Sequence, residues 1–207
     1  MSIASVSHSL VFGLRQDIRD NLFSVDDDSI IYPAGSNVIV TQKNTKKFVS
    51  MSDKGEGIAS ITVSPDRHLL AISERSLKPS IHVYEVSTLR KRRVLAPSES
   101  YNAKEFSCMS FSADSKYLVA QLSHPEWILH YYAWDKGKLL ATVGSSPSPS
   151  KILQTSINPF DGSVVFLLGD KCTRFYRYTE GELKISPLSI PEAVFSNNLD
   201  ISKSFLD

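Results

Sequence analysis

Val63-Ser64-Pro65-Asp66 occurs in this chain in four versions at nearly regular intervals, and this repeat decides the fold. Each version has an apolar residue, then Ser or Asn, then a turn that contains Asp, and a further apolar run follows. The Ser or Asn stands at positions 24, 64, 112 and 158, which gives intervals of 40, 48 and 46 residues. A period in the forties with such a turn is typical of a four-stranded β-propeller blade. The other three versions are Phe23–Asp26, Phe111–Asp114 and Ile157–Asp161.

The residues on either side of each turn favour strands. Proline fixes φ and Asp bonds its own backbone, so Ser-Pro-Asp closes a tight turn between short runs rich in Val, Ile, Phe and Tyr. No segment has apolar residues at helical spacing over three turns, so almost no helix is expected. The third strand of each later blade is aromatic, and Trp134-Asp135 stands where a WD repeat has its Trp-Asp pair. The alternative is a β-sandwich with accidental periodicity. We expect an all-β, WD40-type propeller with blades at about 21–51, 58–95, 106–143 and 152–186.

The composition argues against a basic nucleic-acid binder, a membrane protein and a secreted protein. The chain has 207 residues, enough for one domain or two small ones, and its 23 Lys and Arg residues nearly balance 22 Asp and Glu residues. A net charge of +1 argues against a globally basic nucleic-acid binder. The longest apolar run, Val164–Leu168, is far too short for a membrane span, and no secretory signal is visible. Cys108 and Cys172 make no disulfide framework, so we expect a reducing compartment such as the cytoplasm.

No group of residues has the spacing of a catalytic, cofactor or metal site. Gly144–Ser148 lacks the second glycine of a nucleophile elbow, and Gly137 has no glycine five residues before it, as a P-loop requires. Ser148–Lys151 fits the Ser-x-x-Lys spacing only trivially in so serine-rich a chain. The five histidines are scattered, and Asp26–Asp28 lacks the glycine of a calcium loop. We therefore expect a non-enzymatic module without cofactor, metal or small-molecule substrate.

Two surface features are candidate functional sites, one for protein contact and one for phosphorylation. The run Arg90, Lys91, Arg92 and Arg93 falls on the outer strand of the second blade, where charge also prevents edge-to-edge pairing. A solvated edge without a binding role is therefore the first interpretation. Among the functional ones, contact with an acidic protein surface is favoured over a nuclear signal or a nucleic-acid patch. The loop between the third and fourth blades has Ser-Pro steps at Ser146 and Ser148, which are candidate phosphorylation sites unless the loop is only a solvated connector.

Seven phrases, in this order and spacing, resemble the N-terminal end of one group of WD-repeat proteins: Val11–Arg15, Ile30–Pro33, Ser64–Arg67, Leu70–Glu74, Arg90–Leu95, Asp114–Leu118 and Glu180–Lys184. The group is the cilia- and flagella-associated protein fifty-seven family. The resemblance implies an axonemal scaffold of the cilium or flagellum, in the cytoplasm and cytoskeleton, that supports inner dynein arm assembly and motility. It implies axonemal partners, such as inner dynein arm or regulatory-complex components, and no membrane or nucleic acid. A generic WD-repeat adaptor in a cytosolic multiprotein complex is the alternative.

The family pattern also predicts how the chain is organised. Members carry two tandem propellers and then coiled coils, whereas this chain stops after about four blades, as a truncated isoform or fragment would. We expect residues 1–186 to form a partial propeller, an open ring with an exposed apolar face on its terminal blade. Leu10–Arg15 has the alternating apolar residues of a strand that closes the ring, and residues 187–207 are a divergent tail.

Overall fold

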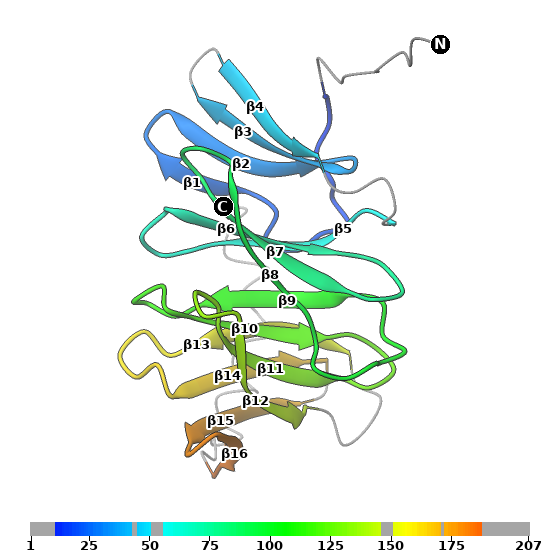
Figure 1. Ribbon diagram of the computed structural model, residues 1–207, viewed down its shortest axis with the longest axis vertical. Helices are drawn as coiled ribbons and strands as arrows, with labels where there is room; N and C mark the ends of the chain where they lie inside the picture. The colour runs from blue at the N-terminus through cyan, green and yellow to red at the C-terminus, as the bar shows by residue number, and fades with distance from the viewer. Residues whose placement is uncertain (1–10, 43–44, 51–55, 146–150, 171, 188–207) are drawn as a thin grey trace, which may run out of the picture.

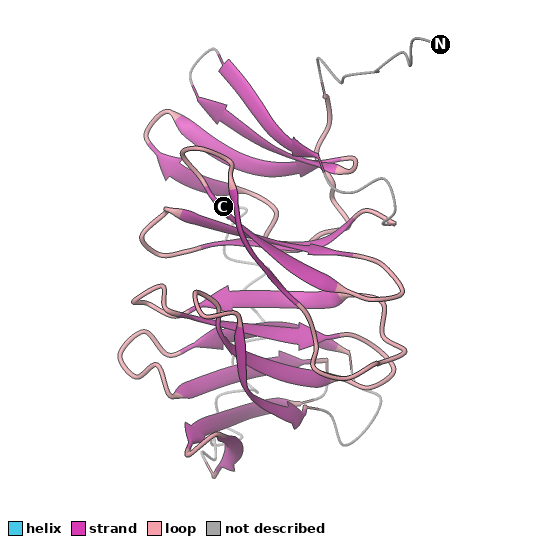
Figure 2. Cartoon of the chain, in the orientation of Figure 1, coloured by secondary structure: helices cyan, strands magenta, loops and turns pink. Residues whose placement is uncertain are grey.

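The computed structural model describes residues 11–42, 45–50, 56–145, 151–170 and 172–187. These residues form strands, turns and links, and no helix is found among them (Figure 2). The strands group into four antiparallel sheets, each of four strands in chain order. The sheets are β1 (Phe23–Asp26), β2 (Ser29–Ala34), β3 (Asn37–Gln42) and β4 (Thr45–Ser50); β5 (Ile58–Val63), β6 (Leu69–Glu74), β7 (Ser80–Glu85) and β8 (Lys91–Leu95); β9 (Phe106–Phe111), β10 (Tyr117–Leu122), β11 (Ile128–Ala133) and β12 (Lys138–Gly144); and β13 (Ile152–Ile157), β14 (Val164–Gly169), β15 (Thr173–Thr179) and β16 (Glu182–Ser186).

The four sheets follow one another as propeller blades do. The first sheet lies at the top of Figure 1 and the fourth at the bottom. The first strands meet along a common axis, because β9 contacts both β5 and β13, and residues of β1, β5, β9 and β13 line one cavity of about 260 Å³. Since the first and fourth sheets lie at opposite ends, the ring is open. The predicted fold, an open WD40-type β-propeller of about four blades, is confirmed.

The repeated stretch closes the turn between the first and second strands. In the second sheet, Ser64 Oγ accepts the N–H of Leu69 at 2.9 Å, and Asp66 Oδ1 accepts the N–H of His68 at 3.1 Å. Arg67, between them, has φ of 62°, a left-handed conformation that such a turn requires. Side chains thus satisfy the backbone donors that the turn leaves unpaired.

The third sheet repeats this turn with different neighbours. Ser112 Oγ accepts the N–H of Tyr117 at 2.9 Å, Asp114 Oδ1 accepts the N–H of Lys116 at 3.1 Å, and Ser115 has φ of 58°. The hydroxyl of Ser112 also donates to Asp114 at 2.6 Å, and this hydrogen bond lowers the pKa of the Asp114 carboxyl. The same polar chemistry therefore produces the same turn 48 residues further along the chain.

The hydrophobic core consists of three layers between successive sheets. Because neighbouring residues of a strand point to opposite faces, each sheet contributes to two layers. Leu70 packs in the layer between the first and second sheets, whereas Ala71 packs in the layer between the second and third. In the same way, Leu118 packs in the layer between the second and third sheets, and Val119 packs in the layer between the third and fourth. The aromatic third strands fill these layers, and Tyr131 and Tyr176 are fully buried, as are Tyr132, Phe106 and Ile31.

The first and last described segments do not pair with each other as they would in a closed propeller ring. Leu10, where the expected closing strand begins, lies outside the described residues, and Val11–Arg15 forms no strand. A closing strand pairs with the last blade, but here Arg15 donates its backbone N–H to Pro33 of the first sheet at 3.0 Å. Of the expected tail, only Pro187 is among the described residues.

Exposed apolar side chains occur on both terminal sheets. Before the first sheet, Phe12 is 76% exposed and Leu22 is 58% exposed, and on the sheet Ile30 of β2 is 40% exposed. On the fourth, Phe160 is 98% exposed and Ile185 is 61% exposed. In the part of the chain that the structure describes, no helix has the length and apolarity needed to span a membrane.

Candidate protein-interaction surfaces

The predicted basic run lies at the outer edge of the second sheet. β8 pairs only with β7, so its second edge is unpaired, and Arg90 precedes it in the turn. The side chains of Arg90, Lys91, Arg92 and Arg93 are all exposed. The strand register shifts between Val83 and Tyr84, so that Arg93 faces the first and Lys91 the second, with Arg92 as the extra residue.

Two of these cations have partners that are not carboxylates. Lys91 Nζ lies 5.7 Å from the centre of the Tyr84 ring, a cation–π distance. Arg93 Nε donates to the backbone oxygen of Asp135 at 2.9 Å, which ties β8 to the turn between β11 and β12 of the third sheet. Among the described residues, none of the cations on β4, β8 and β12 forms an ion pair.

The part of the basic run on β8 belongs to a longer feature, which we call the basic rim: the Lys and Arg residues of the four outer strands β4, β8, β12 and β16. These strands carry seven Lys or Arg residues and one carboxylate, Glu182, whereas the four first strands carry one charged residue, Asp26. All seven cations are exposed. β4, β8 and β12 come in that order from top to bottom in Figure 1. The members are Lys46, Lys47, Lys91, Arg92, Arg93, Lys138 and Lys184.

Sequence reasoning found only the β8 part of the basic rim. The signal for the remainder is weak, because Lys46 and Lys47 form a short pair and Lys138 and Lys184 stand alone. Aligning the fourth strands of the repeats places them in equivalent positions, since each begins or nearly begins with a cation.

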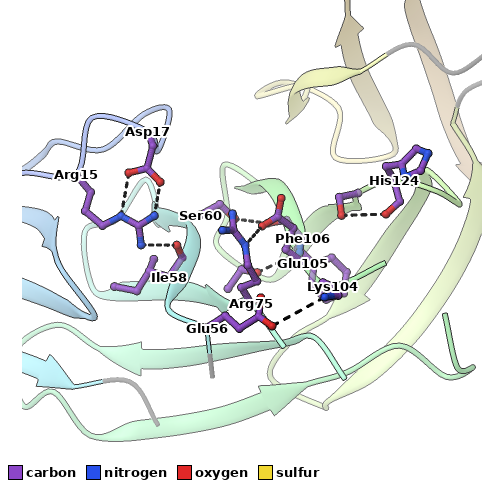
Figure 3. A network of polar contacts seen from close by, with 12 residues as sticks. Arg15, Asp17, Glu56, Ile58, Ser60, Arg75, Lys104, Glu105, Phe106 and His124 are labelled. Carbon is purple, nitrogen blue, oxygen red and sulfur yellow. Dashed lines mark hydrogen bonds and ion pairs between the residues drawn. The ribbon is translucent and has the colours of Figure 1, made fainter. Parts of the chain in front are cut away.

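A network of polar contacts joins the sheets at the end where the first strands begin (Figure 3). Arg15 pairs with Asp17 and donates from Nη1 to the backbone oxygen of Ile58 at 3.0 Å, so the segment before the first sheet is tied to the second. The hydrogen bond to Asp17 raises the pKa of Arg15 and lowers that of Asp17. Both groups are therefore charged at neutral pH.

The second and third sheets are joined in the same region. Arg75 Nε lies 2.5 Å from Glu105 Oε2, and Ser60 Oγ donates to the backbone oxygen of Phe106 at 2.7 Å (Figure 3). Lys104 Nζ and Glu56 Oε1 are 3.9 Å apart, and more than half of each side chain is exposed, so this pair contributes little to stability.

Beside this network lies a cleft of about 560 Å³. Its residues come from the β6–β7 and β10–β11 turns, from the links that precede β9 and β13, and from the start of β9. In a four-stranded meander these turns and links meet at one end of the sheets, because the first strand begins where the second ends. The lining consists of Arg75, Asn102, Lys104, Glu105, Ser107, Ser123, His124, Pro125, Trp127 and Lys151.

Glu126 holds one wall of this cleft. Its carboxylate accepts the backbone N–H of Asn102 at 2.7 Å and that of Ala103 at 3.0 Å. Burial by itself raises the pKa of Glu126, but these hydrogen bonds more than offset burial, so the pKa is lowered. The link between the second and third sheets is thereby fixed to the β10–β11 turn.

The buried titratable groups are held in their neutral forms. Burial lowers the pKa of His130 to about 4 and that of His82 to about 4, so both imidazoles are uncharged at neutral pH. Burial raises the pKa of the Cys108 thiol to about 12, so it is not a thiolate nucleophile. In the described residues, no three His, Cys, Asp or Glu side chains are grouped as a metal site would require.

The two predicted phosphorylation sites, Ser146 and Ser148, lie outside the described residues. Ser145, which precedes them, is fully buried and donates its backbone N–H to Trp127 at 2.7 Å. The described chain resumes at Lys151, whose side chain is exposed.

The relatives found by comparison with known proteins are named cilia- and flagella-associated proteins. No protein-family profile matches the chain. The chain is 38% identical to mouse cilia- and flagella-associated protein 57 over 84% of its own length and 14% of the mouse protein. It is 26% identical to cilia- and flagella-associated protein 57 C of Tetrahymena thermophila, over 83% of this chain and 14% of that protein. It is 24% identical to mouse cilia- and flagella-associated protein 44, over 83% of this chain and 9% of that protein.

The chain thus spans about 14% of the length of the first two relatives. The match to the mouse protein nevertheless covers 84% of this chain. It agrees with the resemblance that the seven phrases between Val11 and Lys184 indicate. The chain is a relative of the cilia- and flagella-associated protein 57 family, and the predicted resemblance to that family is confirmed.

Proposed function

We propose that this chain is a non-enzymatic interaction module of the ciliary or flagellar axoneme. The names of its relatives support a ciliary or flagellar location, and we place the chain in the cytoplasm and cytoskeleton of that organelle. Its partners are axonemal proteins, and components of the inner dynein arm or of the regulatory complex are the specific candidates. In this role the chain supports inner dynein arm assembly and motility as a scaffold.

The observation that carries the proposal is the basic rim. Its exposed cations exceed the carboxylates of the same strands by six, although the chain as a whole has a net charge of only +1. Such segregation creates a positive potential on one surface, which attracts acidic protein surfaces and speeds association. Tubulin and dynein subunits are the acidic axonemal surfaces that this chemistry fits.

Arg92 and Arg93 are the cations on which the contact depends most. They are the last two cations of the run and lie on β8, at an unpaired edge, and neither has a carboxylate partner among the described residues. Exposed charges act over about 8 Å at physiological ionic strength, so the interaction weakens as salt is added.

Binding to demembranated axonemes tests the proposal. The tagged chain is added, and the bound fraction is measured at increasing salt concentrations. Arg92→Glu combined with Arg93→Glu is expected to reduce the affinity about tenfold, because a reversed charge repels the acidic partner. Lys78→Glu combined with Lys116→Glu is the matched control, since it makes the same change in net charge at exposed residues away from the basic rim.

Two results would reject the proposal. If both double variants bind as the unchanged chain does, the basic rim is not the contact surface. If the unchanged chain remains in the supernatant and purifies instead with a soluble complex, the alternative role as a cytosolic WD-repeat adaptor is supported.

A further inference from the structure

We propose that the cleft beside the Arg75–Glu105 pair is a second binding site, separate from the basic rim, for an acidic peptide segment that carries an aromatic or large aliphatic side chain. The volume of about 560 Å³ lies within the range of ligand-binding pockets in proteins. The charges of the cleft, its apolar wall and the way its loops are held each support this assignment.

The charges of the cleft favour an acidic ligand. Arg75, Lys104 and Lys151 contribute three cations, and Glu105 is the one carboxylate of its lining. Glu105 is already engaged by Arg75 Nε, and among the described residues the Nη groups of that arginine form no hydrogen bond or ion pair, although Asp17 lies near enough to interact with its charge.

The two lysines of the cleft, Lys104 and Lys151, form weaker ion pairs than Arg75 or none in the described part of the chain. Lys104 has only its long, exposed pair with Glu56, and Lys151 forms no ion pair within the described ranges. Cations therefore outnumber carboxylates in the lining, which is the arrangement that an acidic ligand complements.

The cleft also has an apolar lining, in which Pro125 is exposed and Trp127 is a core residue that is 8% exposed. Pro125 and Trp127 of the β10–β11 turn line the cleft, with His124 beside them. Aromatic and proline faces bind apolar side chains by contact area, and a neighbouring cation then recognises an adjacent carboxylate. A ligand with both groups contacts both the cations and the apolar residues of the lining.

The loops of the cleft are already in place before any ligand binds. Trp127 has φ of 48°, which is unusual for a bulky residue, and its backbone N–H donates to Ser123 at 3.1 Å. Glu126 anchors the link that carries Lys104, as described above, and Asp170 donates its backbone N–H to Lys151 at 2.9 Å. A preformed site loses less conformational entropy on binding, and strained backbone of this kind is concentrated at functional sites.

Tryptophan fluorescence of the full chain gives a direct test. The chain has two tryptophans, and Trp134 donates its indole N–H to Ser115 in a different part of the third sheet. The probe is the blocked peptide acetyl-GDEFEDG-amide. Its controls are acetyl-GDEAEDG-amide, which lacks the aromatic ring, and acetyl-GKRFRKG-amide, which reverses the charge. The first peptide is expected to change the emission saturably, and the other two to bind about tenfold more weakly or not at all.

Variants assign the effect to the cleft. Lys104→Glu combined with Lys151→Glu is expected to weaken the acidic peptide at least about tenfold. Arg92→Glu combined with Arg93→Glu makes the same change in net charge on the basic rim and is expected to leave peptide binding unchanged. Trp134→Phe should preserve the fluorescence change, which Trp127→Phe should abolish.

Several outcomes would overturn the proposal. Equal binding of the acidic and basic peptides, or equal loss in the two double variants, would show a general charge effect and no cleft. Full displacement of the peptide by inorganic phosphate at matched ionic strength would indicate a small-anion site. Circular dichroism of each variant establishes that it is folded. The Arg92→Glu, Arg93→Glu double variant separates loss of peptide binding in the cleft from loss of axoneme binding through the basic rim.

Discussion

The Nε atom of Arg75 lies 2.5 Å from Oε2 of Glu105, and this ion pair joins the β6–β7 turn of the second sheet to the link that enters the third. The two side chains are 39% and 25% exposed, so solvent partly screens the interaction. The pair lies where the second and third sheets meet (Figure 3), and both of its residues line the proposed peptide cleft.

Breaking this pair should lower the stability of the propeller modestly. Glu105→Gln removes the charge but keeps the size of the side chain, and we expect the free energy of unfolding in urea to fall by about 1 kcal/mol after allowance for screening. Glu182→Gln is the control, because its pair with Lys184 at 3.4 Å is more exposed on both sides. An equal loss in the two variants would show that the Arg75–Glu105 pair has no special role between the blades.

The repeated turn should depend on its buried serine. Ser112 is 1% exposed, and its hydroxyl oxygen accepts the backbone N–H of Tyr117. Ser112→Ala leaves this donor unpaired and removes the hydrogen bond to Asp114, so we expect a loss of about 1–2 kcal/mol in unfolding free energy. The pKa of Asp114, followed by NMR titration, should rise towards its ordinary value.

A matched change at an exposed serine tests whether burial is the cause. Ser87→Ala removes an exposed hydroxyl in the β7–β8 turn and should change the stability by less than about 0.5 kcal/mol. If Ser112→Ala is as harmless as Ser87→Ala, the hydroxyl does not hold the turn together.

Acid should destabilise the chain in part through His130. Burial lowers the pKa of this imidazole in the folded state to about 4, from an ordinary value of 6.5. The folded state therefore binds its proton less readily than the unfolded state. The contribution to stability is fully present above pH 6.5 and is lost as the pH falls from there towards about 4.

Comparing stability curves isolates this effect from that of the carboxylates. Between pH 7 and pH 4, His130→Gln should lose about 3 kcal/mol less unfolding free energy than the unchanged chain, because glutamine does not titrate. His82→Gln leaves His130 in place, so its curve should keep that part of the slope. Parallel curves for the unchanged chain and His130→Gln would contradict the prediction.

The Cys108 thiol should react slowly while the chain is folded. Thiol reagents attack the thiolate, and burial raises the pKa of Cys108 to about 12 from an ordinary 9.0. A shift of this size lowers the thiolate fraction near neutral pH about a thousandfold. In Cys172→Ser, where Cys108 is the remaining cysteine, labelling by iodoacetamide at pH 8 should be slow in buffer and fast in concentrated urea. Labelling at the same rate in both conditions would show that the thiol is not protected.

Several features of the fold could be predicted without coordinates, because they arise from local chemistry. Ser64 with Asp66, and Ser112 with Asp114, satisfy backbone groups within a few residues, so each turn is encoded where it forms. The alternation of apolar residues assigns the faces of each strand, and the position of Arg90–Arg93 after the third strand places the run on an outer edge.

The candidate sites depended far more on the tertiary structure. The basic rim could have been found by aligning the outer strands, since its signal repeats with the blades. The cleft could not, because Arg75, Lys104 and Lys151 belong to three different loops and nothing in their local sequence relates them. They come together only when the second, third and fourth sheets stack around the axis.

His82 and His130 show the same division between local and distant causes. The sequence by itself determined that both stand on the third strands of successive blades, because strand period and turn chemistry are local properties. Only the tertiary structure decided their surroundings: His82 Nε2 lies 3.8 Å from the Glu74 carboxylate, whereas His130 packs between the rings of Tyr132 and Phe106. The reason is that burial and electrostatic environment depend on which residues the neighbouring strands and sheets bring into contact, as when Phe106 of β9 lies against His130 of β11, and strand periodicity alone does not fix those contacts.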